Sequence, residues 1–541
     1  MSTSTSEGVG TERQWVVVAA KQIQPWLARS PKLKLMRGAS HALRVLTSKT
    51  DVEGRLTGDL ASLGATVEKQ GTTVDGVVTL TVTHPTHAPQ VAELVVAKLG
   101  ALLPGLTWEA WWTSAPDYVT AMDRHRDHDD ALVSRLPQEL PFARTCETCR
   151  QETGVAERTV VTPTPDRRGS AEKEVRWMGR DCITRLERAK HDDRWPSVDG
   201  AWPEDFDELA KWGGRQREAA PAIADSTTTA TSADRASDVV GRHRSSNHLA
   251  TVCADGNRMG DLFEVIAAAG PHFGGFRGRV SALLDETLHT KVERAAAGLS
   301  REAAVKVGIP HYIGGDDVLV TVRAEAAWSF VAALMTGFDE IKMVLREELD
   351  GVVLPAGADS DRLAKKHEDH RKDIAAAIEH ISMGVGLVFS HSSHPFDTCR
   401  HHGEAALSTA KKETRGAESA VCWVDLTEGS HPTSDRVLTA NRLMSLLAAT
   451  PTGAGELSST ARSQLHGLLA ATPVEDWEKV VNSWVKRTQS AEVCLGAPGQ
   501  LPAELSRLRW WPTSPTGAPA GTDTLSNPTG TGTLRNQGAD S

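Results

Sequence analysis

The feature that most constrains the fold is a pair of apolar runs joined by Gly314-Gly315-Asp316-Asp317. VGIPHYI precedes the glycines and VLVTV follows the aspartates, and both have the β-branched and aromatic content of buried strands. Because glycine adopts positive φ angles at little cost, the two glycines allow a tight turn between the strands. The sequence therefore predicts a β-hairpin whose tip carries two adjacent carboxylates, Asp316 and Asp317.

A third acid, Asp255, ends the apolar run LATVCA and precedes a turn from Gly256 to Gly260. If the strand that ends at Asp255 pairs with the hairpin, three carboxylates meet at one point. Neighbouring carboxylates destabilise each other unless water or cations neutralise them, and two divalent cations do so at sites of phosphoryl transfer. We therefore predict a metal site at Asp255, Asp316 and Asp317, with an exposed acidic turn as the alternative.

Strands and helices are mixed along the rest of the chain. Strand patterns occur in WVVVAA, GVVTLTVTHP, SMGVGLVFS and AVCWVDL, and helical spacing occurs in APQVAELVVAKLGALL, EAAWSFVAALMTGF and GEAALSTAKKE. From Arg436 to Val485 the spacing of Leu, Ala and Trp favours a bundle of helices. A chain of 541 residues exceeds the size of a single core, so we expect several domains of the α+β class.

Charge and cysteine content restrict the setting of the chain. The net charge of -10 requires any contact with nucleic acid to use local basic patches, such as Lys32, Lys34 and Arg37. Seven scattered cysteines favour a reducing compartment over a disulfide framework. Neither a signal peptide nor an apolar stretch of 18 residues is evident, so we expect a cytoplasmic protein that does not contact membranes.

A possible zinc site lies in the middle of the chain, where Cys146 and Cys149 form a CxxC pair. This spacing lets two thiolates bind one tetrahedral zinc ion, with Cys182 as a third ligand. The pattern supplies no fourth ligand, for which His191 is one guess beside an aspartate and water. A structural zinc ion and a metal-free knuckle both stay open. Since this insert is distant from the acidic turns in sequence, we expect activity not to depend on it.

The acidic turns resemble the palm domains of nucleotidyl cyclases, GGDEF-type cyclases and, most closely, the large polymerase subunit of type III CRISPR effector complexes. GGDD rather than GGDEF favours that subunit. Its first turn reads Asp-Gly-Asp-x-x-Gly, and this chain has Asn257 in place of the second acid. The segment AAKQIQPWLARSPKLKLMRGAS, with a Gln-rich strand end and a Gly-Ala-Ser turn, is similar to the start of the first palm in that family.

The resemblance implies roles for further residues. Lys411 would contact a triphosphate, although a solvated lysine on a helix face is an equal alternative. Ser40 and Ser281 would line a pocket for a second nucleotide between two palms, although each serine would serve equally well as a helix cap or packing contact. The residues expected to bind nucleotide are Gly256, Asn257, Gly260, Ser281, Gly314, Gly315, Lys411 and Ser40.

The resemblance also implies an α+β protein with two ferredoxin-like palm domains, a zinc-knuckle-like insert and a C-terminal helical domain. The expected boundaries are a disordered N-terminus at 1–14, the first palm at 15–140, a zinc-knuckle-like helical insert at 141–215, a linker at 216–245, the second palm with the GGDD motif at 246–428, a C-terminal helical domain at 429–511 and a disordered tail at 512–541.

Members of that family often begin with an HD nuclease domain, whereas this chain enters its first palm almost at once. The run HRDHDD, from His125 to Asp130, contains the letters of an HD pair, but it is typical of a solvated charge run. We therefore predict no DNA cleavage by this chain.

The function implied is the joining of ATP into cyclic oligoadenylate messengers, with release of pyrophosphate. Mg²⁺ or Mn²⁺ would be held by the three aspartates. Guide RNA, target RNA and other effector subunits would be the partners, and target RNA would switch the reaction on. Two alternatives stay open, a catalytically inactive scaffold that binds guide RNA and partner subunits, and a free-standing nucleotide cyclase.

Overall fold

The computed structural model describes most of the chain between residues 12 and 511. The described ranges are 12–30, 32–68, 75–126, 132–133, 144–163, 171–189, 205–210, 247–297, 308–353, 361–449, 453–488 and 499–511. The tail predicted at 512–541, the linker predicted at 216–245 and His191 lie outside these ranges, as do residues 1–11 and most of the charge run that begins at His125.

The N-terminal unit is an antiparallel sheet of five strands, in the order β2-β3-β1-β4-β5. Its strands are β1 (Arg13–Lys21), β2 (Ala65–Val67), β3 (Val77–Val82), β4 (Thr107–Ala115) and β5 (Leu132–Val133). Its helices are α1 (Ile23–Ala28), α2 (Leu33–Leu46), α3 (Lys49–Ser62), α4 (Ala88–Leu102) and α5 (Tyr118–Arg126).

The central strand β1 is apolar without alternation because both of its faces are buried. Val16 and Val18 point into one hydrophobic cluster with residues of α2 and α4. Trp15 and Val17 point to the other face, where they pack against residues of β4 and α5. Helices therefore cover the sheet on both sides.

The second unit is a sheet of six strands in the order β13-β12-β11-β8-β10-β9. Its strands are β8 (His248–Asn257), β9 (Gly308–Gly314), β10 (Asp317–Arg323), β11 (Ser382–His391), β12 (Ala420–Asp425) and β13 (Val437–Thr439). Its helices are α9 (Met259–Ala268), α10 (Gly274–Ala297), α11 (Ala327–Asp350), α12 (Asp361–His380) and α13 (Phe396–Thr414). The predicted hairpin is present as β9 and β10, in which Asp317 pairs with Gly314.

The two units share one connection pattern. In each, two hairpin-linked strands lie between helices, so that the elements run β-α-β-β-α-β along the chain. The corresponding strand orders are β2-β3-β1-β4 and β9-β10-β8-β11. The expected α+β class is therefore confirmed, and both units have the same core arrangement.

The two sheets are joined through a continuous hydrophobic core. Val252 and Ala254 of β8 face the cluster formed with α10 and α11. Cys253, between them, faces the opposite side of the sheet, where it joins Leu319 of β10 in the cluster that also contains Leu27 and Val16 of the first unit. The first unit therefore packs directly onto one face of the second sheet.

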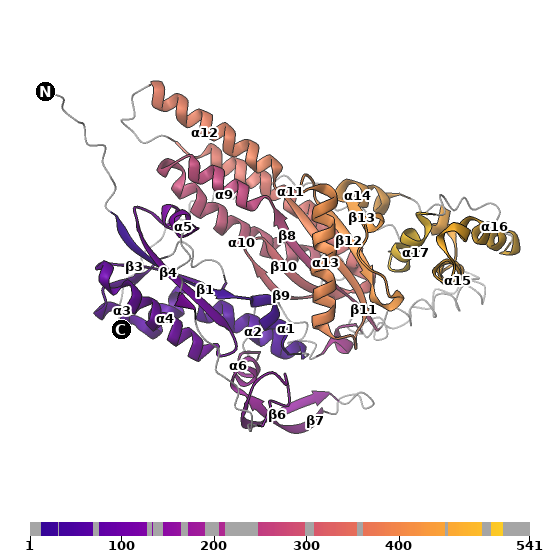
Figure 1. The fold of residues 1–541 in the computed structure, drawn as a ribbon, viewed down its shortest axis with the longest axis horizontal. Helices are drawn as coiled ribbons and strands as arrows, with labels where there is room; N and C mark the ends of the chain where they lie inside the picture. Colours follow the sequence, from indigo (N-terminus) through magenta and orange to yellow (C-terminus); the bar gives the residue numbers. More distant parts are fainter. Residues whose placement is uncertain are drawn as a thin grey trace, which may run out of the picture.

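The insert between the units is only partly helical, in contrast to the helical insert expected at 141–215. Its described part is an antiparallel ribbon of β6 (Gly154–Pro163) and β7 (Ala171–Gly179), followed by α6 (Arg180–Arg188). Figure 1 shows this ribbon beside α2 and α1, at one end of the first unit. The prediction of a helical insert missed this two-stranded ribbon, which follows the CxxC pair.

The expected C-terminal helices are present as α14 (Ala440–Ala448), α15 (Ser459–Ala470), α16 (Trp477–Thr488) and α17 (Leu501–Arg509). In Figure 1, α15 to α17 lie beyond the edge of the second sheet that carries β12 and β13. Trp510, just after α17, donates a hydrogen bond of 2.7 Å from Nε1 to Asp425 at the end of β12. Within the described ranges, no helix combines the length and the apolar character that crossing a membrane requires.

Candidate functional site

Strand pairing brings the three predicted aspartates together. β8 pairs with β10 so that Ala254 lies opposite Val318, which places Asp255 and Asp317 next to each other at the ends of the two strands. Asp316 occupies the hairpin turn after Gly315, whose φ of 63° is in the left-handed region that favours glycine. A Cβ atom added to Gly256 would lie 2.7 Å from Asp316 Oδ2, so the backbone after Asp255 approaches the hairpin tip as only glycine allows.

Burial makes this cluster costly to ionise. Burial, together with the nearby charge of Asp255, raises the pKa of Asp316 to about 6 and that of Asp317 to about 7. The positive charge of Lys411 acts in the opposite direction on both acids. A site with several carboxylates and one lysine therefore favours the binding of further cations.

Lys411 reaches the acids from α13. Its ammonium group forms an ion pair with Asp255 and donates a hydrogen bond of 3.3 Å to the carbonyl of Gly256. The aliphatic part of Lys411 passes over Gly384 of β11, where an added Cβ would lie 2.8 Å from Lys411 Cγ. The sequence resemblance named Lys411, and the structure brings it to the acidic cluster.

Asn257 is turned away from the acids. Its side chain is buried, and its Nδ2 donates a hydrogen bond of 2.7 Å to Ser382 Oγ on β11. Ser382 in turn donates to the carbonyl of Gly416, after α13. The Asn257 side chain thus ties β8 to its neighbours, and Gly260 lies in the first turn of α9.

The two predicted serines are separated from the acidic cluster's pockets. Ser40 lies in α2 and is 2% exposed, and Ser281 lies in α10 with a partly buried side chain. Neither serine is among the residues that line the two pockets beside the acids.

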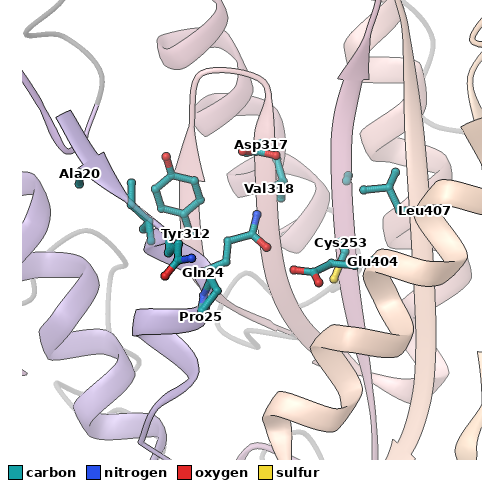
Figure 2. A pocket seen from close by; sticks show the side chains of 12 residues that line it. Ala20, Gln24, Pro25, Cys253, Tyr312, Asp317, Val318, Glu404 and Leu407 are labelled. Carbon is teal, nitrogen blue, oxygen red and sulfur yellow. The ribbon is translucent and has the colours of Figure 1, made fainter. Parts of the chain in front are cut away.

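A pocket of about 430 Å³ lies between the first unit and the second sheet. Figure 2 shows α1 on one side and the strands with Asp317, Val318 and Cys253 opposite, with Glu404 and Leu407 of α13 closing a third side. The lining residues are Ala20, Gln22, Ile23, Gln24, Pro25, Cys253, Ala254, Tyr312, Asp317, Val318, Glu404 and Leu407.

A second pocket of about 340 Å³ continues along α13. It is lined by Asp255, Glu404, Leu407, Ser408, Lys411 and Lys412. Because Glu404 and Leu407 line both pockets, the two spaces adjoin, with Asp317 in one and Asp255 in the other. Asp255 and Asp317 therefore lie where two pockets adjoin.

Sequence reasoning did not single out Gln22, Gln24, Tyr312 and Glu404 as site residues. The two glutamines had one visible signal, the Gln-rich strand end that resembles the start of the first palm. Glu404 and Tyr312 carry no local signal, because the packing of α13 and β9 brings them to the pocket.

The cysteines of the insert form a second cluster. The cluster contains four residues, Cys146, Cys149, Cys182 and Glu152. One ligand atom from each lies within 4.8 Å of the other three. Three thiolates and a carboxylate match the donor set and number that a tetrahedral zinc ion takes. Glu152 was missed by the sequence prediction, although it follows Cys149 by three residues in the same turn.

Asp255 on β8 thus lies beside a hairpin that carries two more aspartates, the arrangement that the sequence resemblance implied for a palm domain. Residues 248–419 match the family described as Cas10/Cmr2, second palm domain. Over these residues, the match confirms the resemblance to the palm subunit of type III CRISPR complexes that the sequence predicted.

Several solved structures are similar to this chain at low sequence identity. A chain of the Csm1-Csm4 cassette in complex with one ATP has a TM-score of 0.48 and 13% identity, with 94% of this chain and 71% of that chain covered. Csm1 in T. onnurineus has a TM-score of 0.46 and 15% identity, with 92% of this chain and 69% of that chain covered. Among curated proteins, no sequence match was found.

Proposed function

We propose that this chain is the nucleotidyltransferase of a type III CRISPR-like antiviral complex, which converts ATP to cyclic oligoadenylates and releases pyrophosphate. The observation that carries the proposal is that Asp255 and Asp317 lie side by side on paired strands and line two adjoining pockets, with Asp316 next to them in the hairpin turn. The match of residues 248–419 to the second palm of Cas10/Cmr2 supports the same reaction class.

The acidic cluster fits a pair of divalent ions in its chemistry. Oxygen ligands suit Mg²⁺ and Mn²⁺, and the raised pKa values of Asp316 and Asp317 mark carboxylates that lack sufficient positive charge. In the described ranges, the cysteine cluster alone brings three or more ligand atoms within 4.8 Å of one another. The three aspartates do not meet that spacing, so the metal assignment rests on their chemistry and on the strand pairing that brings them together. When bound, such ions activate the attacking hydroxyl and offset the charge on the transferred phosphate.

The chain's own residues would orient two nucleotides. The pocket with Lys411 and Lys412 offers two ammonium groups to a triphosphate, beside the carboxylates of Asp255 and Glu404 that metal ions would neutralise. The amides that begin helix α9 lie at its anion-binding end. Lys411 now pairs with Asp255, so a triphosphate would compete with that carboxylate for the lysine. The pocket between α1 and the second sheet would take the other nucleotide.

The finer architecture belongs to the same proposal. We assign the two units to ferredoxin-like palms at 15–140 and 246–428, supported by their common β-α-β-β-α-β order. We also assign a structural zinc ion to Cys146, Cys149 and Cys182, with Glu152 as the fourth ligand. Guide RNA, target RNA and further effector subunits are the proposed partners.

One observation favours the alternative of an inactive scaffold. The place of the second acid in the first turn is taken by Asn257, whose side chain is buried against Ser382 and offers no carboxylate. A scaffold would bind guide RNA and partner subunits without forming any product.

Product formation from labelled ATP with Mn²⁺ tests these assignments. We would compare the chain alone, the assembled effector complex, and that complex with matching target RNA. The proposal expects weak activity alone and strong activity with target RNA, because RNA shifts the palms toward a closed arrangement. An absence of product under all three conditions would identify a scaffold. Full activity of the chain alone, unaffected by RNA, would identify a free-standing cyclase.

A further inference from the structure

Helix α1 forms one wall of the pocket between the sheets. Gln22, Ile23, Gln24 and Pro25, at its start, line the pocket, and Figure 2 shows Gln24 pointing into it. The helix has only six residues, too few for a stable helix without tertiary support. The shape of this wall therefore depends on whatever holds the other end of α1.

A buried ion pair from the insert holds that end. Arg185 of α6 donates hydrogen bonds to the carbonyls of Trp26, at 2.6 Å, and Leu27, at 3.2 Å. Its guanidinium lies 4.5 Å from the centre of the Trp26 ring. The Trp26 carbonyl also accepts a hydrogen bond of 3.3 Å from the Arg29 amide, and the cation of Arg185 adds a second donor there and complements the helix dipole.

Asp181 completes this clamp, which we define as Asp181, Arg185 and Trp26. Its carboxylate accepts hydrogen bonds from Arg185 Nε at 3.0 Å and from Trp26 Nε1 at 3.2 Å. Both Asp181 and Arg185 are 1% exposed. Separating Asp181 from Arg185 would leave two buried charges without partners, which is energetically costly. The residues of the clamp are therefore expected to move together.

The clamp is attached directly to the cysteine cluster. The Glu152 carboxylate accepts hydrogen bonds of 3.1 Å from the backbone amides of Asp181 and Cys182, at the start of α6. Cys182 is itself one of the four clustered residues. The same carboxylate therefore faces the thiols and fixes the first turn of the helix that carries the clamp.

Arg29 provides a second connection. It follows α1 immediately and donates hydrogen bonds to the Gln151 side chain at 3.0 Å and the Gln151 carbonyl at 3.2 Å, next to Glu152. It also donates to the carbonyl of Gly105, before β4, at 3.1 Å. Arg29 also lies 3.9 Å from the Asp181 carboxylate, so it links the end of α1 both to the loop of the cysteine cluster and to the clamp.

These parts pack without space between them. A Cβ atom at Gly38 of α2 would lie 1.8 Å from the carbonyl oxygen of Arg185, and one at Gly179 would lie 2.1 Å from Glu152 Cδ. Close-packed groups transmit a displacement instead of absorbing it. A change in the cysteine cluster would therefore shift α6, the clamp and α1 together.

We infer that the clamp of Asp181, Arg185 and Trp26 couples metal binding at the cysteine cluster to nucleotide binding in the pocket lined by α1. Arg185, Asp181 and Arg29 act as positioning residues in this coupling and do not contact the nucleotide. The identity of the ligand, ATP, rests on the proposed function. The insert therefore influences the site, in contrast to the independence expected from its distance in sequence.

The test measures binding of an ATP analogue that cannot release pyrophosphate, by equilibrium dialysis with the full chain. Zinc content is measured on the same samples. Removal of the metal by a chelator should weaken analogue binding by about tenfold, within the usual range of coupling between two sites. Unchanged affinity after removal, or a purified chain without metal, would overturn the coupling.

Variants separate the coupling from a general loss of structure. Arg29→Ala should keep its metal and fold cooperatively, with a melting temperature lowered by only a few degrees, but weaken analogue binding several-fold. Chelation should then have a smaller effect than in the parent chain. Arg185→Lys, which keeps the charge but loses the paired hydrogen bonds, should behave in the same way. Arg55→Ala, on α3 in an exposed ion pair with Asp51, is the matched control and should bind normally.

Two outcomes distinguish this inference from the proposed function. Chelation, Arg29→Ala and the two together each weaken analogue binding by some factor. If the combined factor equals the product of the two single factors, the metal and Arg29 act separately and the inference fails. If the chain binds the analogue with the expected coupling but forms no product from ATP, only the proposed function fails. A chain that binds no analogue at all would contradict both.

Discussion

Lys411 forms an ion pair with Asp255, although 156 positions separate the two residues in the chain. The contact depends on α13 lying directly on β11, where a Cβ at Gly386 would approach the carbonyl oxygen of Gly403 to 2.0 Å. The lysine places one positive charge against three carboxylates, and it lowers the pKa values of Asp316 and Asp317 against the effect of burial.

Lys411→Ala should raise KM for ATP by about 10–100-fold, since a charge-assisted hydrogen bond contributes roughly 1.5–3 kcal/mol. The loss of its charge should also move the pH profile of kcat/KM to higher pH, because Asp316 and Asp317 become harder to ionise. Lys372→Ala, an exposed lysine on α12, is the matched control. An unchanged KM for Lys411→Ala would exclude a triphosphate role.

The hairpin and the strand that carries Asp255 could be predicted because their signals are local, although the strand continues to Asn257 and does not end at Asp255. Apolar runs and glycines within ten residues determine both turns. The direction of the Asn257 side chain could not be predicted in this way, since it depends on Ser382, 125 positions away. Lys411 was named through the family resemblance, because an isolated lysine on a helix has no local signal for its partner.

The cysteine cluster shows a similar limit. Cys146 and Cys149 were recognisable from their spacing, and Cys182 from its residue type. Glu152 was not, because glutamates are common in exposed loops and its place near Cys182 depends on the packing of α6 against the loop. The link from this cluster to α1 has no sequence signal, since Arg185 and Trp26 are 159 positions apart.

Nucleotide transfer should decrease as the pH falls. Metal ions bind the ionised carboxylates, and Asp316 and Asp317 have pKa values raised to about 6 and about 7. Because the two acids interact, the apparent pKa values seen in the profile should belong to the pair and not to either residue alone. We expect kcat/KM, measured with Mg²⁺ from pH 5.5 to 8.5, to rise with an apparent pKa between about 6 and 7. A flat profile would contradict the assignment.

The same acids should lower stability at alkaline pH when metal is absent. Their folded pKa values exceed the ordinary value of 3.8, so between about pH 4 and 7 the folded chain binds more protons than the unfolded chain. Stability contributed by these groups therefore falls as pH rises through this window. Asp316→Asn with Asp317→Asn should raise the melting temperature by a few degrees at pH 8 and by less at pH 5. If the double variant melts at a lower temperature than the parent chain at pH 8, these two acids do not destabilise the folded chain.

The purified chain should contain about one zinc ion, because a Cys₃Glu site is a complete tetrahedral donor set. Cys146→Ser and Glu152→Ala should each reduce the zinc content. Cys422→Ser, a buried cysteine on β12, is the control that should retain it. Metal analysis that finds no zinc in the parent chain would support the metal-free knuckle.

The hairpin aspartates are proposed to hold the catalytic metal ions. The double variant Asp316→Ala with Asp317→Ala removes both carboxylates and tests this role. The control is Asp339→Ala with Glu340→Ala, an adjacent pair of exposed acids on α11. Both variants would be assembled into the effector complex with matching target RNA and incubated with labelled ATP and Mn²⁺. We expect the hairpin variant to form no labelled oligoadenylate, the control to form as much as the parent chain, and both variants to fold. Turnover by the hairpin variant equal to that of the parent chain would contradict this role.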